Sequence, residues 1–261
     1  MTDYCILLTD FGNKDNFTGV MKGVISKICP GTRFIDLCNE IPQGDIYKAY
    51  FQLVSAYKYM PAAVYLIVVD PGVGSNRNAL IAKYGDSFFV APDNGVLTHF
   101  IKNKADVYKI KPHDFMPENI STTFHGRDIF APTAGALLKG INLELLSEPF
   151  SAGQNPILLE LREPVVLNNK IIASIQYIDN FGNLFTNIPG LMLEHKKLIT
   201  VSISLNGKVL SNINSFYSEI ETGFPGALIG SSGYVEIFVR NGNAKNYFNA
   251  ETGNELIIEF R

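Results

Sequence analysis

The sequence has little of what marks several large protein classes. Its 261 residues include three cysteines and four histidines, and no apolar stretch approaches the roughly 20 residues that span a bilayer. The cysteines, Cys5, Cys29 and Cys38, match neither a zinc pattern nor a paired disulfide framework. No basic region precedes an apolar run at the N-terminus, so no secretory signal is recognised. We expect a cytoplasmic protein with no membrane partner and no metal site.

An excess of positive charge is also absent. Lys and Arg number 22 against 25 Asp and Glu, which gives a formal net charge of −3. Proteins that bind nucleic acid through its phosphates need clustered basic residues, so we expect no nucleic-acid partner. The 46% hydrophobic and 18% charged residues instead indicate a globular chain with a large core.

Several familiar catalytic motifs are missing as well. The sequence has no phosphate-binding Gly-Lys-Ser/Thr loop and no Gly-x-Ser-x-Gly elbow, and Gly72-Val73-Gly74 lacks the third glycine of a dinucleotide fingerprint. Asp10-Phe11-Gly12 matches a kinase tripeptide, but no glycine loop, strand lysine or catalytic loop accompanies it. Hydride transfer and nucleoside triphosphate hydrolysis therefore have no support.

The first part of the chain alternates strand-like and helix-like segments. Apolar runs predict strands at Tyr4–Leu8, Arg33–Leu37, Val64–Val69, Ala79–Tyr84 and Phe88–Val90. Helical spacing predicts helices at Asn16–Ile28, Asp45–Met60, Val96–Ile101 and Gly126–Leu138. The alternation predicts an α/β fold, with a Rossmann-like layered N-terminal domain built on a mostly parallel sheet over residues 1–155.

The pattern changes after about residue 168. Strand-like runs follow one another between Asn- and Gly-rich turns, at Lys170–Ile178, Leu198–Leu205, Gly233–Val239 and Glu255–Phe260. This pattern predicts a smaller C-terminal antiparallel β domain over residues 165–261. The stretch from Ser151 to Pro164 reads as the connector.

Polar residues follow the predicted strands of the α/β domain, where ligands bind in open sheets. Asp10 follows the first strand, Asp70 follows the third with Arg77 close behind, and His125 stands at a predicted helix start. Each has an ordinary alternative: Asp10 as a turn residue, Arg77 in a surface ion pair, His125 as a core or capping residue. The motif Asp93-Asn94-Gly95 is most often a simple turn. Together they indicate a site at this edge of the sheet.

The β domain carries a second polar group. Asp179-Asn180-Phe181-Gly182-Asn183 places an aromatic ring among amides and a carboxylate, and Gly230-Ser231-Ser232-Gly233 precedes Glu236. Such an aromatic residue can stack on a base while the amides read its polar edge. The alternative is a pair of β-turns with a structural phenylalanine.

Six motifs in order carry a family resemblance. They are Thr9-Asp10-Phe11-Gly12, Asp70-Pro71-Gly72-Val73-Gly74, Ala91-Pro92-Asp93-Asn94-Gly95, Phe124-His125-Gly126-Arg127-Asp128, Asp179-Asn180-Phe181-Gly182-Asn183 and Ser231-Ser232-Gly233. Across nearly the whole chain, this combination resembles the SAM hydroxide adenosyltransferases. These adenosine-forming S-adenosylmethionine hydrolases are related to the fluorinase and chlorinase.

The resemblance implies cleavage of S-adenosylmethionine by water to adenosine and methionine, without a metal or cofactor. It implies that Asp70, Arg77 and His125 are catalytic and that Asp10 binds the ribose diol. It also implies a homotrimer whose active sites lie at subunit interfaces, between the α/β domain of one subunit and the β domain of its neighbour. Which of Asp70 and His125 takes the proton stays open.

The remaining substrate contacts are implied by the same resemblance. Phe181 and Asn183 would bind the adenine, together with main-chain groups near Val239. Asp179, Ser231, Ser232 and Glu236 would bind the carboxylate and ammonium of the methionine.

Two other functions compete with hydrolysis. A non-catalytic sensor of S-adenosylmethionine or adenosine would not need the Asp70, Arg77 and His125 set. A halogenase resembling the fluorinase would have Tyr, Thr and Ser where this chain has Asp70, Val73 and Gly126. A carboxylate beside a halide is repulsive by several kcal/mol in a dry site, so the sequence disfavours a halogenase.

Overall fold

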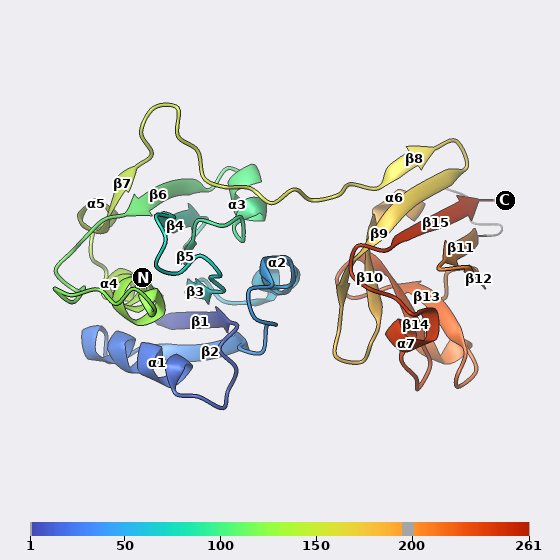
Figure 1. Cartoon of the computed structure of the whole chain (residues 1–261), viewed down its shortest axis with the longest axis horizontal. Helices are drawn as coiled ribbons and strands as arrows, with labels where there is room; N and C mark the ends of the chain where they lie inside the picture. Colours follow the sequence, from blue (N-terminus) through green and yellow to red (C-terminus); the bar gives the residue numbers. More distant parts are fainter. Residues whose placement is uncertain (1, 195–200, 261) are drawn as a thin grey trace. The chain divides into compact units, whose positions relative to one another are not determined.

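The computed structural model describes residues 2–194 and 201–260, and the chain divides into two compact units, Met1–Leu159 and Glu160–Arg261 (Figure 1). The sequence predicted domains over 1–155 and 165–261. Each unit has its own sheet and its own buried core.

The first unit is built on a seven-stranded mixed sheet. In sheet order its strands are β2 (Arg33–Cys38), β1 (Tyr4–Thr9), β3 (Val64–Val68), β5 (Ser87–Pro92), β4 (Ala79–Tyr84), β6 (Asp106–Ile110) and β7 (Ser147–Pro149). The pairs from β2 to β5 are parallel, whereas β4, β6 and β7 pair antiparallel. The prediction of a mostly parallel sheet is therefore wrong for this second half, and the Rossmann-like arrangement stays a prediction.

The reversal has a simple cause. Tyr84 pairs with Ser87 across a tight turn that contains Gly85 at φ +58°. A connection this short cannot cross over to a parallel neighbour, so β4 and β5 form a hairpin.

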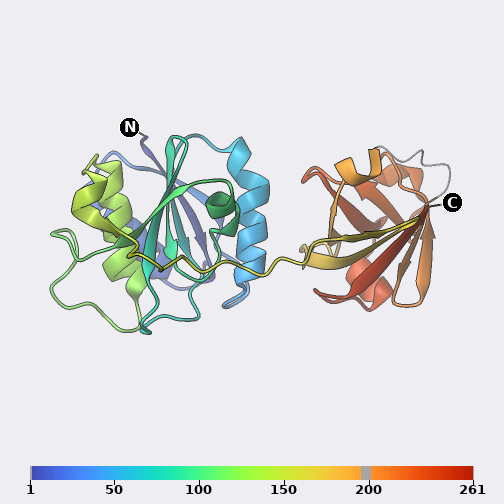
Figure 2. The same ribbon diagram turned by 90° about the horizontal axis from the view of Figure 1, so that it is seen from above.

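Helices cover both faces of this sheet, and Figure 2 shows α2 and α4 on opposite sides of it. The helices are α1 (Phe17–Ile28), α2 (Ile46–Ala56), α3 (Thr98–Lys102), α4 (Ala131–Leu138) and α5 (Leu143–Leu146). Alternate residues of β1 point to opposite faces of the sheet. Cys5 and Leu7 pack with α1 and α4, and Ile6 and Leu8 pack with α2. No helix among the described residues is long and apolar enough to cross a membrane.

The second unit is an antiparallel β structure. In sheet order its strands are β12 (Lys208–Ser211), β11 (Val201–Leu205), β15 (Glu255–Phe260), β9 (Lys170–Ile178), β10 (Leu184–Pro189), β14 (Tyr234–Val239) and β13 (Pro225–Ile229), with β8 (Val165–Leu167) on β9. All pairs between these strands are antiparallel, as predicted. The short helices are α6 (Leu191–Glu194) and α7 (Ala244–Phe248). The start of the predicted strand Leu198–Leu205 lies outside the described residues.

Candidate active site

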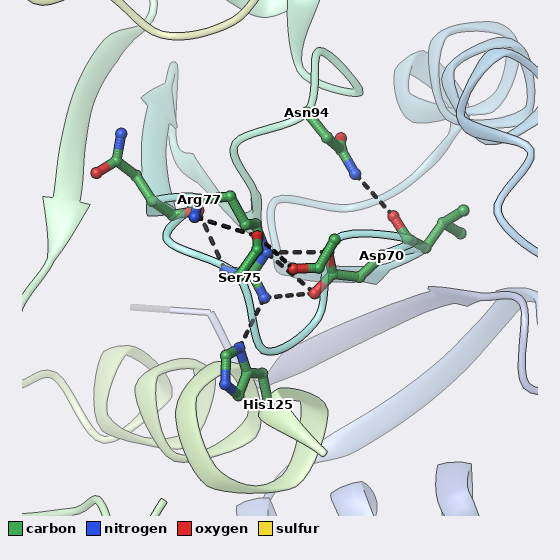
Figure 3. A network of polar contacts seen from close by, with 8 residues as sticks. Asp70, Ser75, Arg77, Asn94 and His125 are labelled. Carbon is green, nitrogen blue, oxygen red and sulfur yellow. Dashed lines mark hydrogen bonds and ion pairs between the residues drawn. The ribbon is translucent and has the colours of Figure 1, made fainter. Parts of the chain in front are cut away.

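Asp70, Arg77 and His125 meet in one hydrogen-bonded cluster (Figure 3). Asp70 lies just beyond β3, Arg77 ends the loop before β4, and His125 precedes a single turn of π-helix, Gly126–Phe130. The Nε of Arg77 donates to Asp70 Oδ1 at 2.9 Å and to Oδ2 at 3.1 Å, and Nη2 donates to the same carboxylate. Arg77 Nη2 also lies 2.9 Å from His125 Nδ1.

The Asp70–Arg77 pair is buried. Its side chains are only 5% and 9% exposed, and the guanidinium carbon lies 5.0 Å from the centre of the Phe130 ring. Arg77 Nη1 donates to the backbone oxygen of Asn78 at 3.2 Å. Burial with several partners excludes the alternative of a surface ion pair, and it fixes the guanidinium in one orientation.

His125 is held in a defined tautomer. A guanidinium can only donate, so Nδ1 of His125 accepts from Arg77 and the neutral ring carries its proton on Nε2. Burial lowers the pKa of His125, and the charge of Arg77 lowers it further, against the opposing charges of Asp70 and Asp128. The ring can therefore donate a hydrogen bond from Nε2 while it stays neutral.

A cavity of about 590 Å³ opens beside this cluster, and Asp10, Asp70 and His125 all line it. Its volume suits a small-molecule ligand. Asp10 Oδ2 accepts from the backbone N–H of Gly44 at 2.8 Å. Burial raises the pKa of Asp10, as does the nearby charge of Asp70, although the Gly44 hydrogen bond opposes the shift.

The same cavity is lined by three aromatic side chains for which the sequence predicted no role. Phe11, Phe17 and Phe124 contact one another with ring centroids 5.2–5.8 Å apart. Phe11 follows Asp10 and Phe124 precedes His125. Their positions next to predicted site residues were the feature of the sequence that could have indicated them. They give the polar cluster an apolar wall.

Gly126 is closely packed where the chain leaves His125. A Cβ added there would lie 3.0 Å from Met21 Sδ and 3.1 Å from a ring carbon of Phe124. A side chain at this position would therefore shift Met21 or the Phe124 ring by a few tenths of an ångström. The serine that the fluorinase pattern has at this position does not fit without such a shift.

In the second unit, Asp179, Phe181 and Asn183 share the turn between β9 and β10. Asp179 Oδ1 accepts from the backbone N–H groups of Phe181 at 2.9 Å and of Asn183 at 2.8 Å. This arrangement presents the Phe181 ring, which is 77% exposed. The carboxylate of Asp179 thus shapes the turn that displays the aromatic residue.

The other predicted binding residues of this unit lie along the β13–β14 hairpin. Glu236 is 3% exposed and accepts from Tyr217 Oη at 2.7 Å, and burial above all raises the pKa of its carboxyl group. Ser231 is exposed, whereas the hydroxyl of Ser232 is buried without a hydrogen-bond partner among the described residues. Val239 ends β14, and its backbone oxygen accepts from Gly242 N at 3.0 Å.

The register separates these residues into two groups. Leu184, next to Asn183, pairs with Ile237, while Pro189 pairs with Tyr234 near the two serines. The turn with Phe181 and Asn183 therefore lies at the Val239 end of β14, and Ser231 and Ser232 lie at the other end. The six residues of β14 make five steps, which puts its two ends roughly 16 Å apart. Asp179 shares the turn with Phe181, and its charge also contributes to the raised pKa of Glu236.

No group of three or more His, Cys, Asp or Glu side chains that could hold a metal ion occurs among residues 2–194 and 201–260.

Comparisons with known proteins give one consistent result. Residues 5–147 match the SAM hydroxide adenosyltransferase N-terminal domain, and residues 173–257 match the C-terminal domain of the same family. The chain is 32% identical to the (R)-S-adenosyl-L-methionine hydrolase of Salinispora tropica, over 98% of each protein. A fluorinase from Nocardia brasiliensis is more distant, at 24% identity over 94% of this chain and 93% of that protein.

A solved structure has a similar fold. The crystal structure of an uncharacterized conserved protein from Thermotoga maritima has a TM-score of 0.89 and 35% sequence identity, covering 97% of this chain and 99% of that one. With both family domains matched in order, the chain belongs to the SAM hydroxide adenosyltransferase family.

Proposed function

We propose that this protein hydrolyses S-adenosyl-L-methionine to adenosine and L-methionine. The observation that carries the proposal is the Asp70–Arg77–His125 cluster, with its buried ion pair, at the wall of a ligand-sized cavity in a member of this family. Relatives named as hydrolases match nearly the full chain at about 30% identity, whereas the fluorinases are more distant.

The reaction is a displacement at the 5′ carbon of the substrate. The oxygen of a water molecule forms a bond to this carbon while the carbon–sulfur bond breaks, and its electron pair goes to the positive sulfur. As water loses its proton, negative charge builds up on the attacking oxygen and cancels the positive charge of the sulfonium. A site poor in water favours such a step. The aromatic wall of Phe11, Phe17 and Phe124 supplies such surroundings. Holding water in line with the leaving sulfur contributes further.

The cluster divides the roles. Nδ1 of His125 accepts a hydrogen bond from Arg77, so His125 orients the water by donating a hydrogen bond from Nε2. Asp70 keeps unused lone pairs beside its Arg77 contacts and takes the proton. Such general-base catalysis contributes about 10²–10⁴-fold to the rate. Arg77 holds both partners in place.

The binding roles follow the two ends of the ligand. Asp10 accepts from the ribose hydroxyls, and Phe181 and Asn183 bind the adenine near Val239. Ser231 and Ser232, at the other end of β14, bind the methionine part. Asp179 acts by shaping the Phe181 turn, and the buried Glu236 supports the strand from which the serines extend.

We also propose the homotrimer that the family resemblance implies, with each active site shared between subunits, in the cytoplasm. Its support is the division of the predicted site residues between two separate units. In a closed head-to-tail ring, His125→Ala and Asn183→Ala subunits refolded together restore about a quarter of the sites. Proven mixed trimers without recovered activity would contradict this assembly.

One assay tests the reaction itself. The pure protein is incubated with S-adenosylmethionine, with and without chloride, and the products are separated by reverse-phase chromatography. Adenosine in both samples is the expected result. A 5′-chlorinated nucleoside would identify a halogenase, and unchanged substrate that still binds would identify a sensor.

A further inference from the structure

The motif Asp93-Asn94-Gly95 takes no part in the chemistry above, yet its side chains reach both ends of the catalytic loop. This loop runs from Asp70, just beyond β3, to Arg77, just before β4. The side chain of Asn94 lies at the start of the loop (Figure 3), and that of Asp93 lies at its end.

Asn94 fixes the backbone beside Asp70. Its Nδ2 donates to the backbone oxygen of Val69 at 2.8 Å, and Val69 immediately precedes Asp70. Its Oδ1 accepts from the backbone N–H of Val96 at 3.2 Å, which sets the orientation of the amide. Val69 is fully buried beyond the last paired residue of β3, so this bond satisfies a carbonyl outside the sheet ladder.

Asp93 fixes the backbone beside Arg77. It is 3% exposed, and its Oδ2 accepts from Asn78 Nδ2 at 2.9 Å. The backbone N–H of Asp93 donates to Asn78 O at 3.0 Å, and Arg77 Nη1 donates to the same oxygen at 3.2 Å. The carbonyl that Arg77 uses is therefore itself held by Asp93.

The same motif anchors the segment just before the second unit. Asp93 Oδ1 accepts from Ile157 N at 2.8 Å, and Thr98 Oγ1 accepts from Leu159 N at 2.7 Å. Gly95 has φ +94°, and a Cβ there would lie 2.9 Å from the backbone nitrogen of Leu159. Only glycine allows the chain to pass this closely.

We propose that Asp93 and Asn94 are positioning residues of the hydrolytic cluster. Asn94 holds the chain at Asp70 and Asp93 holds it at Arg77, so the pair sets how carboxylate and guanidinium meet. The kinetic consequence rests on the proposed hydrolysis, because displacing a catalytic group by about 1 Å costs on the order of 10²-fold in rate.

The first test compares Asn94→Ala with Asn103→Ala. Asn103 Nδ2 also donates to a backbone oxygen of the first unit, that of His99 at 2.7 Å, so the control loses a bond of the same kind away from the cluster. Well below the melting temperature, we expect Asn94→Ala to lower kcat by about 10–100-fold with KM nearly unchanged. The NMR ring signals of His125 shift in Asn94→Ala and stay in place in Asn103→Ala.

The second test separates hydrogen bonding by Asp93 from its charge. Asp93→Ala lowers kcat, whereas Asp93→Asn retains it, because the amide of Asn78 can turn over and accept from the new side chain while Ile157 N keeps an acceptor. Asn78→Asp alone makes two carboxylates face each other and lowers kcat. Adding Asp93→Asn to Asn78→Asp restores activity, and this reciprocal rescue is the signature of a direct contact.

A purely structural role predicts other results. Asn94→Ala with a lower melting temperature, unchanged kcat and unmoved His125 signals would overturn the proposal, as would failure of the reciprocal rescue in folded protein. If the wild type releases no adenosine, the proposed hydrolysis fails instead. The His125 ring signals then decide the positioning role by themselves.

Discussion

The two units hold their polar residues in different ways. In the first, Asp70 and Arg77 are almost fully buried and bonded to each other, and His125 completes the cluster. In the second, Asp179 bonds to its own turn, and the Phe181 ring that this turn presents is 77% exposed. The first set of residues forms a catalytic cluster within its own unit. The second set presents an exposed aromatic ring that can contact a ligand.

The difference predicts that the first set controls the rate and the second set controls ligand affinity. Substitutions in the Asp70–Arg77–His125 cluster change the rate and the stability of the first unit, because they disturb groups that already hold one another. Substitutions in the exposed turn change ligand affinity and leave the fold intact. Substitutions in the two sets of residues test that separation.

Asp70→Asn and His125→Ala lower kcat by about 10²–10⁴-fold, because each removes a group that orients or deprotonates the water. The dissociation constant for adenosine stays close to that of the wild type. Steady-state kinetics and calorimetry measure the two quantities. A variant that no longer binds adenosine but keeps a normal kcat would show that these residues bind the ligand rather than catalyse the reaction.

Arg77→Met lowers the free energy of unfolding by about 3–5 kcal/mol, because it leaves the Asp70 carboxylate buried without its cation. Lys22→Met is the matched control: Lys22 pairs with Asp36 at 2.7 Å, but these side chains are 27% and 46% exposed. The control costs about 0–1 kcal/mol. Urea unfolding measures both variants, and equal losses would show that burial does not distinguish the two pairs.

Phe181→Ala weakens adenosine binding by about 1–3 kcal/mol through loss of base stacking, with little change in kcat or melting temperature. Val209→Ala, at a position 64% exposed in the same unit, controls for loss of surface apolar area. Binding that is equal in the two variants would remove Phe181 from the adenine site.

The smallest effect concerns pH. Burial lowers the pKa of His99, His113 and His125 below their ordinary value of 6.5. Below pH 6.5 these three histidines bind more protons in the unfolded chain than in the folded one, so their contribution to stability falls as the pH drops through this range. Urea unfolding from pH 7.5 to 5.5 should show this slope, and His113→Gln should reduce it. A constant or rising stability would contradict the prediction.

Several strands were predictable because their local pattern determines them. Ala79–Tyr84, Lys170–Ile178 and Glu255–Phe260 match β4, β9 and β15 at both ends, since each is an apolar or alternating run between turn residues. The direction of pairing was not predictable from an apolar run. The turn containing Gly85 held that information, and the sequence reading did not use it.

The site was predictable at the level of motifs rather than contacts. Asp70 and Arg77 lie in one loop, so their proximity was predictable, but His125 joins them from 48 residues further along the chain. The bond from Asn94 to Val69 spans 25 residues, while an Asn-Gly pair in a sequence indicates only a turn. Such contacts depend on the assembled sheet.

The origin of the new oxygen in adenosine tests the proposed hydrolysis most directly. The protein is given S-adenosylmethionine in water enriched in the heavy oxygen isotope, and adenosine and methionine are examined by mass spectrometry. Attack of water at the 5′ carbon predicts heavy oxygen at the 5′ position of adenosine, none in methionine, and slower labelling by the Asp70→Asn variant. Adenosine without the label, or labelling at the same rate in that variant, would contradict it.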